Sequence, residues 1–219
     1  DAADSSLSTT TTTATTHEKM WPALVARLRR ERFVDAGDIH ALAPTARAGV
    51  TALQHSLSAA VARLATDLYD RRAQFVWEIL QNADDATYAD GVLPELRLSL
   101  RSVEPTSTNN GSPSLAVVFR AESNERGFSA ADLVALCDVS RSTKELDAQT
   151  TGHKGIGWKS VFAASAAPEV RSGAMAVRFD LHRDGPLGMV APTLLPVDDA
   201  GRESAAGTRI DVPLADAAV

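Results

Sequence analysis

Residues 75–85 restrict the fold of this chain more than any other stretch, because they predict a helix with two chemically different sides. Glu78, Asn82 and Asp85 stand at positions i, i+4 and i+7, which share one face of a helix. The opposite side is an apolar stripe at helical spacing, formed by Phe75, Val76, Ile79, Leu80 and Ala83. We expect this helix to extend over residues 72–88 and to bury its stripe in the core.

The polar side of this helix suits magnesium and water chemistry. Asn82 offers a hard oxygen ligand of the kind that Mg²⁺ prefers, so it is a candidate metal ligand. Glu78, one turn earlier, can orient or deprotonate a water molecule, so it is a candidate catalytic residue. A solvated polar face is the alternative interpretation, because polar helix faces commonly do nothing more than contact solvent.

A glycine-rich segment later in the chain suits a polyphosphate. Gly152, Gly155 and Gly157 let the backbone approach a ligand closely, and the apolar run from Trp158 predicts a helix after the last glycine. The backbone N–H groups, the helix dipole and Lys154 would favour negative charge there. A tight turn without a ligand is the simpler alternative. The segment lacks the ending of a P-loop and the preceding strand of a dinucleotide-binding turn, so both alternatives fall away.

The remaining pattern favours an α+β sandwich. Residues 17–33 and 50–68 have helical spacing, and Ser129 is a candidate N-cap for a helix over residues 130–137. Strands are predicted at residues 96–100, 115–119, 169–171, 175–180, 188–191 and 208–212, the first two as a hairpin. Helices gathered before and between hairpin-linked strands favour layers over a doubly wound parallel sheet.

The composition describes one globular unit. With 219 residues, of which 44% are hydrophobic, the chain can bury an ordinary core and form one domain or at most two. Residues 1–16 are short and polar, which predicts a disordered leader. We expect an N-terminal helical segment over residues 17–68 and a main domain over residues 69–219.

Charge, hydropathy and cysteine usage exclude several classes of protein. No apolar run approaches the roughly 18 residues that cross a bilayer, and the N-terminus lacks the layout of a signal peptide. We therefore expect no membrane association and an intracellular address, cytoplasmic or nuclear. The net charge of -6 argues against nucleic-acid binding by this domain. The single cysteine, Cys137, excludes an internal disulfide and is expected to be buried.

Four motifs follow one another along the chain: Glu78-x-x-x-Asn82-x-x-Asp85, Gly127-Phe128, Gly152-x-x-Gly155-x-Gly157 and Gly207-Thr208-x-Ile210. This ordered set resembles the four motifs of the GHKL ATPase superfamily. Residues 75–85, 124–129, 136–144 and 152–162 resemble the sacsin and NO VEIN-like branch more closely still. The resemblance implies a Bergerat-type two-layer α/β sandwich, in which helices cover a mixed, mainly antiparallel sheet, here with an N-terminal helical extension. It also implies that residues 69–219 form an ATP-binding domain like those of histidine kinases and heat-shock chaperones.

The resemblance implies a role for each candidate site residue. Glu78 would position the attacking water, Asn82 would ligate Mg²⁺ and Asp85 would line the pocket. Residues 152–157 would close over the phosphates as an ATP lid, with Gly152, Lys154, Gly155, Ile156 and Gly157 as contacts. Thr208 would help to hold the adenine, and Gly127 would let the backbone pass close to the base.

One departure from the superfamily pattern concerns the base. The Asp that usually accepts a hydrogen bond from the adenine amino group is absent, and residues 123–127 read Ser-Asn-Glu-Arg-Gly instead. A buried donor on the base needs an acceptor, which Ser123 or Asn124 would have to supply. Lys159 is either a further phosphate contact or a solvated surface charge, and Trp21 and Trp77 are expected in the core.

Two functions remain open on the sequence. The first is a Mg²⁺-dependent ATP-binding module with weak ATPase activity, whose nucleotide-ordered lid regulates adjoining domains of a larger polypeptide or protein partners. Its ligands would be ATP or ADP with Mg²⁺. The second is a nucleotide-free interaction scaffold that keeps the same fold, an alternative that the altered residues 123–125 favour.

Overall fold

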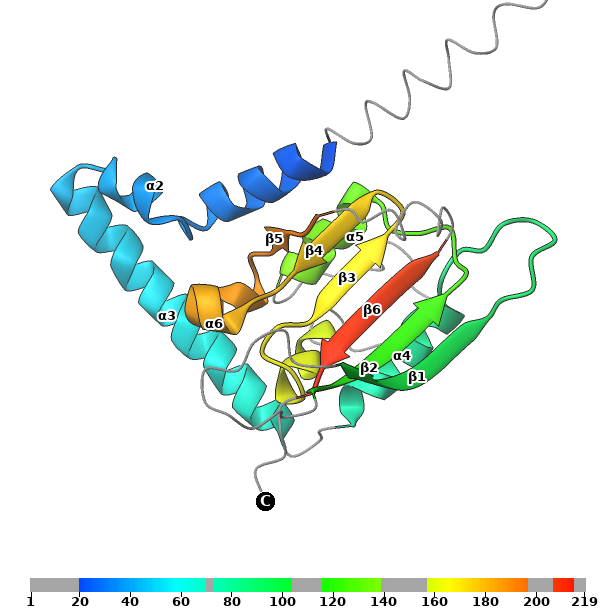
Figure 1. Cartoon of the computed structure of the whole chain (residues 1–219). Coiled ribbons are helices and arrows are strands. Elements are labelled where there is room, and N and C mark those ends of the chain that lie inside the picture. The colour runs from blue at the N-terminus through cyan, green and yellow to red at the C-terminus, as the bar shows by residue number, and fades with distance from the viewer. Residues whose placement is uncertain (1–19, 70–72, 104–115, 139–156, 197–206, 215–219) are drawn as a thin grey trace, which may run out of the picture.

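The computed structural model describes residues 20–69, 73–103, 116–138, 157–196 and 207–214 (Figure 1). Residues 20–31 form the N-terminal helix. The other helices are α2 (Ala36–His40), α3 (Pro44–Tyr69), α4 (Gln74–Asp84), α5 (Ala130–Cys137), α6 (Leu181–Asp184) and the 3-10 helices η2 (Gly157–Ala163) and η3 (Gly185–Met189). The strands are β1 (Leu96–Val103), β2 (Ala116–Ser123), β3 (Glu169–Ser172), β4 (Met175–Arg178), β5 (Thr193–Leu194) and β6 (Thr208–Pro213).

One six-stranded sheet organises the fold, in the order β1-β2-β6-β3-β4-β5. Every strand pairing in the described part of the chain is antiparallel. Helices α4 and α5 lie on one face of the sheet, and the opposite face is turned toward the viewer in Figure 1. The expected α+β sandwich is confirmed. The predicted leader at residues 1–16 and most of the predicted lid, residues 152–156, lie outside the described residues.

The N-terminal helix is part of the same hydrophobic core as the sheet. Trp21, Leu24 and Leu28 are buried and belong to one cluster with Val177 of β4. Arg29 on this helix is also buried, and its guanidinium bonds both oxygens of Asp184 at 2.9 and 3.1 Å. Apolar packing therefore joins the N-terminal helix to the sheet, and the buried ion pair joins it to α6.

Two expectations about the strands need correction or adjustment. The strand predicted at residues 188–191 is wrong, because this region contains the end of η3. A Cβ at Gly188 would lie 2.2 Å from the Asp180 carbonyl oxygen. The chain therefore folds back on the residue that precedes α6, which an extended strand would not do. β4 ends earlier than predicted, because Asp180 caps α6 by accepting hydrogen bonds from the N–H groups of His182 and Arg183.

The expectation that Trp77 belongs to the core is wrong. α4 buries Phe75 and Ile79, whereas Trp77 is 67% exposed. Trp77 lies about 200° around the helix from Phe75, which places it on the flank that the sheet does not cover. Trp21 and Cys137 are buried as expected.

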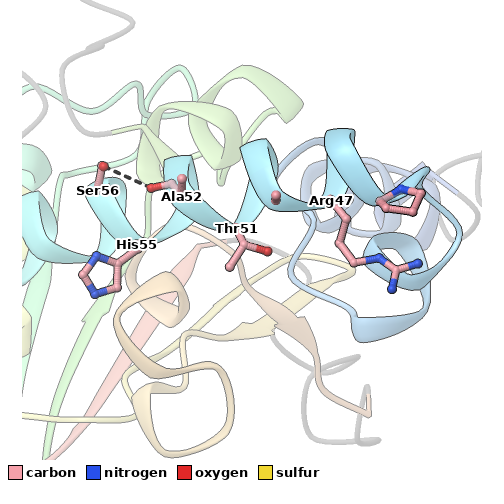
Figure 2. Close-up of a pocket in the computed structure, with 7 residues that line it drawn as sticks. Arg47, Thr51, Ala52, His55 and Ser56 are labelled. Carbon is pink, nitrogen blue, oxygen red and sulfur yellow. Dashed lines mark hydrogen bonds between the residues drawn. The ribbon is translucent and has the colours of Figure 1, made fainter.

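The first half of α3 lines an open depression of about 770 Å³ (Figure 2). Its lining side chains all come from this helix and include Arg47, Thr51 and His55. The Arg47 guanidinium donates to the carbonyl oxygens of His40 and Leu42, which join α2 to the start of α3. None of the candidate site residues that the structure describes lines this depression, so we place the functional site elsewhere. No helix in the described part of the chain combines the length and apolar character needed to span a membrane.

Candidate functional site

The polar flank of α4 is the first part of the candidate site. Glu78 is half-buried on this helix and accepts a hydrogen bond from the side chain of Gln74 at 3.3 Å. Asn82, one turn later, is exposed to solvent, and Asp85 is the residue that caps the end of the helix. The three side chains therefore follow one flank of α4, as the sequence predicted, with Asn82 open to a ligand.

The last glycine of the glycine-rich segment meets this flank. A Cβ at Gly157 would lie 2.0 Å from Oε2 of Glu78 and 2.6 Å from its carboxyl carbon. Only a residue without a side chain allows the backbone to come this close to the Glu78 carboxylate. The structure thus brings Gly157 and Glu78 together, whereas Gly152, Lys154, Gly155 and Ile156 lie outside the described residues.

The helix predicted after the last glycine is the 3-10 helix η2, which covers residues 157–163. Lys159 was expected to contact phosphate or to be a solvated surface charge, and both expectations are wrong, because this side chain is only 2% exposed. Its Nζ donates to the carbonyl oxygens of Leu136 in α5 and Met189 in η3, at 2.5 and 2.6 Å. Lys159 therefore ties η2 to α5 and η3, and its ammonium is occupied within the core.

Burial of Lys159 and Cys137 predicts a specific pH dependence of stability. Loss of hydration lowers the pKa of Lys159 to about 8 and raises the pKa of the neighbouring Cys137 thiol to about 12. Arg32 and Asp138, which form an ion pair at 3.2 Å, are the other charges that act on Lys159. Above about pH 8, Lys159 loses its proton in the native state but keeps it in the unfolded chain, so stability rises with pH. Above the ordinary thiol pKa of 9.0, Cys137 ionises in the unfolded chain only, which opposes this rise.

We expect the free energy of unfolding to increase from pH 8 to pH 9 and then to level off. Urea unfolding at half-unit steps of pH measures it. In Cys137→Ala, the increase should continue toward the ordinary lysine pKa of 10.5. In Lys159→Met, the increase should disappear, and an unchanged slope in that variant would show that other groups cause it.

A row of hydroxyl groups crosses three strands at one end of the sheet. Ser123 of β2 pairs with Thr208 of β6, which pairs with Ser172 of β3. The hydroxyls of Ser172 and Thr208 are 2.8 Å apart, and both residues are buried. Ser172 Oγ also accepts a hydrogen bond from the N–H of Phe128 at 2.8 Å, which fixes the segment after Gly127.

Two glycines with positive φ allow this close packing. Gly127 has a φ of 90°, and a Cβ there would lie 2.9 Å from Ser172 Oγ. Gly207 has a φ of 115°, and a Cβ there would lie 2.3 Å from the carbonyl oxygen of Ser123. The structure therefore requires glycine at both of these motif positions.

The two candidate acceptors for the base differ in their surroundings. The Asn124 side chain accepts a hydrogen bond from the N–H of Glu95 at 2.8 Å and donates one to the carbonyl oxygen of Leu93 at 2.9 Å. It holds the segment before β1, and its polar atoms are occupied. Ser123 Oγ accepts a hydrogen bond from the N–H of Glu125 at 3.3 Å, which leaves it one lone pair more. It also lies 3.4 Å from the hydroxyl of Tyr88, whose own hydrogen bond goes to the carbonyl oxygen of Ala83 in α4. Tyr88 thus joins the end of α4 to the end of β2.

Sequence reasoning missed Ser172 and Glu125. Ser172 reaches the hydroxyl row through the register of β3, which no local pattern reveals. Glu125 places a carboxyl at Thr208, and burial raises its pKa while the hydrogen bond from Thr208 opposes this shift. The absence of the usual Asp had suggested that this end of the site lacks a carboxylate, whereas Glu125 supplies one from a different position in the loop.

Within the described residues, no group of three or more His, Cys, Asp or Glu side chains could hold a metal ion. Mg²⁺ does not require such a group, because it keeps several waters and is commonly held by one or two protein oxygens together with substrate phosphates. The exposed amide of Asn82 beside the carboxylate of Glu78 fits that donor set.

The comparison with known proteins identifies the family of this chain. Residues 59–185 match the family model of the Sacsin domain. The chain belongs to the sacsin domain family. The matched range includes α4, the glycine-rich segment, Ser172 and Glu125, and it ends before Thr208. A sacsin domain therefore contains most of the residues that form the candidate site.

This sacsin domain is similar to part of a much larger plant protein. It is 37% identical to Protein NO VEIN of Arabidopsis thaliana over 147 residues, which cover 67% of the present chain. The matched residues span only 5% of the length of that relative. The similarity therefore concerns one domain of the relative.

Proposed function

We propose that this sacsin domain binds Mg²⁺-ATP, and its product ADP, beside the polar flank of α4. The observation that carries the proposal is the contact between Gly157 and Glu78, which joins the end of the glycine-rich segment to the helix that bears Asn82. A triphosphate at this junction would meet backbone N–H groups from one side and the Mg²⁺ ligand Asn82 from the other. The resemblance to the GHKL superfamily, with its Bergerat fold, supports the same placement.

The hydroxyl row would hold the base. Thr208 and Ser172 are buried, and Gly127 brings the backbone next to them without a side chain. We propose Ser123 or Glu125 as the acceptor for the adenine amino group, because the polar atoms of Asn124 already bond Glu95 and Leu93. A carboxylate such as Glu125 makes the stronger hydrogen bond, because its acceptor is charged.

Hydrolysis, where it occurs, would use Glu78. Its carboxylate can orient a water molecule toward the terminal phosphate, while bound Mg²⁺ would supply charge neutralisation of the phosphates. We expect slow turnover by this domain alone, because several members of the superfamily complete their site with a lysine from a following domain, and here Lys159 is occupied in the core.

Nucleotide state would regulate neighbouring domains or protein partners. The candidate lid consists of residues 152–157, whose three glycines would let the backbone approach the phosphates closely. Ordering of such a segment around phosphates is a common way to switch a docking surface. The large size of the plant relative is consistent with neighbours that respond to this switch.

Calorimetric titration with Mg²⁺-ATP tests the proposal. We expect saturable binding by the wild type and at least about tenfold weaker binding by Asn82→Ala, because the metal loses its protein ligand. Gln81→Ala is the matched control, because Gln81 is an exposed amide on the same helix. Removal of Mg²⁺ should weaken binding by the wild type but change little in Asn82→Ala. A wild type that releases no heat at millimolar nucleotide would contradict the proposal.

A nucleotide-free scaffold is the second candidate function. The observation in its favour is the Asn124 side chain, which is satisfied by the protein itself at the position where base recognition was expected. Thermal unfolding separates the two functions, because a ligand at about 100 times its Kd adds about 2.7 kcal/mol to stability. A scaffold would melt at the same temperature with and without Mg²⁺-ATP.

A further inference from the structure

β1 forms an edge of the sheet. Its first residue, Leu96, pairs with Ser123 of the proposed nucleotide site, and the rest of the strand runs away from that site. Among the strands that the structure describes, β1 pairs with β2 alone. The backbone groups on the other side of this eight-residue strand can therefore pair with an additional strand. An edge strand of this length is an efficient template for strand addition, because main-chain hydrogen bonds supply affinity along its whole length.

One side of β1 is apolar and exposed. Leu98 and Leu100 are 40% and 69% exposed, and they lie opposite Ala121 and Phe119 of β2. α4 covers β2 through Phe75, whose ring contacts Phe119 at a centroid distance of 5.2 Å. The helical layer therefore protects β2 but leaves the leucines of β1 open on the same face of the sheet.

α4 has exposed apolar side chains of its own. Trp77 and Leu80 are 67% and 38% exposed. Leu80 lies about 200° around the helix from Glu78, which meets η2, so Leu80 is on the flank that is turned away from η2. Trp77 lies opposite the buried Phe75 and points away from the sheet, and Figure 1 shows α4 behind β1 and β2.

The other face of the sheet has a surplus of positive charge. Glu169 contacts Arg171 and Arg178, and Asp211 contacts Arg120 and Arg209, so each carboxylate is shared by two arginines. The strand register places on this face the six arginines Arg97, Arg101, Arg120, Arg171, Arg178 and Arg209, and the three carboxylates Glu122, Glu169 and Asp211. This face is positive although the whole chain is negative.

Two of these arginines lie on β1 itself. Arg97 is 68% exposed and contacts Glu95 outside the strand at 2.7 Å. Arg101 is exposed, and it has no ion-pair partner among the residues that the structure describes. Because successive side chains of a strand alternate between faces, an added strand would meet Leu98 and Leu100 on one face of β1 and Arg97, Ser99 and Arg101 on the other.

We propose that β1 is the docking site for an extended segment of a partner protein in which acidic and apolar residues alternate. The apolar side chains would cover Leu98 and Leu100, and the carboxylates would meet Arg97 and Arg101. A second copy of this chain fits less well, because edge-to-edge pairing would bring two positive sheet faces together. The net charge of -6 and the lack of aromatic side chains on the described positive face disfavour a nucleic-acid strand.

A synthetic eight-residue peptide of alternating valine and glutamate, with blocked ends, is the probe. We expect it to bind the wild type saturably, with increased protection of β1 amides from hydrogen exchange. In Arg97→Glu/Arg101→Glu, attraction becomes repulsion at two sites, so affinity should fall by at least about tenfold. The same variant should gain affinity for a peptide in which lysine replaces glutamate. Arg27→Glu/Arg30→Glu is the matched control, because both arginines are exposed on the N-terminal helix.

Further variants separate this site from the nucleotide site. Leu100→Lys should lower the affinity for the glutamate peptide, because it places a charge on the apolar side of β1. Asn82→Ala should bind that peptide with the affinity of the wild type. Equal binding of the glutamate and lysine peptides, or no binding of either, would overturn the proposal. Sedimentation that shows a dimer dissociated by Leu100→Lys would also overturn it, in favour of a second copy.

Discussion

Gly207→Ala should destabilise the protein by about 2–5 kcal/mol, because two separate costs meet at this residue. The φ of 115° at Gly207 is a conformation that residues with a side chain rarely adopt. A Cβ there would also lie 2.3 Å from the carbonyl oxygen of Ser123, a backbone atom that cannot move without shifting β2. The clash falls at the pairing of Ser123 with Thr208, so the strain is applied directly to the hydroxyl row.

Urea unfolding measures this loss, and Gly173→Ala is the matched control. Gly173 also has a positive φ, 55°, but no atom lies within 4 Å of a Cβ built there. That variant should lose only about 1 kcal/mol, the cost of the left-handed conformation. Similar losses in the two variants would mean that the approach of Ser123 to Gly207 is relieved at little cost.

The elements that the sequence predicts well are those with local physical causes. The helix at residues 130–137 has a capping box, in which Ser129 Oγ accepts from the N–H of Asp132 and the Asp132 carboxylate accepts from the N–H of Ser129. The apolar stripe of α4 likewise buries Phe75 and Ile79. In both cases, residues within one or two helical turns determine the structure.

The errors arise where distant residues decide the structure. Lys159 follows a glycine-rich segment and looks like a surface charge, but the carbonyl oxygens that hold it belong to Leu136 and Met189, 23 and 30 residues away. Trp77 is apolar and adjacent to the stripe, but the position of the sheet decides which flank of α4 is covered. Such contacts depend on tertiary packing, which overrides local pattern.

In the candidate site, too, local patterns predict some residues and distant contacts determine others. Glu78, Asn82 and Gly157 belong to motifs that are visible in the sequence, and the contact of Gly157 with Glu78 agrees with those motifs. Ser172 carries no motif and enters the site through its register with Thr208, which follows 36 residues later. Glu125 was visible in the sequence, but only the fold of the loop shows that its carboxyl reaches Thr208.

The second large effect is expected at the ion pair that joins the N-terminal helix to α6. Arg29 and Asp184 have side chains that are each only 7% exposed, and the guanidinium bonds both carboxylate oxygens. Asp184→Ala would leave a buried guanidinium without this partner, so we expect a loss of about 3–5 kcal/mol in the free energy of unfolding. Urea unfolding followed by Trp fluorescence measures it, because Trp21 lies in the core on the same helix.

Asp35→Ala is the matched control for this prediction. Asp35 bonds the same guanidinium at 2.7 and 3.1 Å, but its side chain is 50% exposed, so water can replace it, and the loss should be at most about 1 kcal/mol. The guanidinium also holds down the pKa of the Asp35 carboxyl through these hydrogen bonds, and acid should therefore remove the small contribution of Asp35.

If the charge left behind causes the destabilisation, Arg29→Met combined with Asp184→Ala should recover part of the loss, since no buried charge then remains. A double variant that is less stable than Asp184→Ala would instead show that Arg29 holds the N-terminal helix in place through contacts other than Asp184, such as its hydrogen bond to the carbonyl oxygen of Pro192.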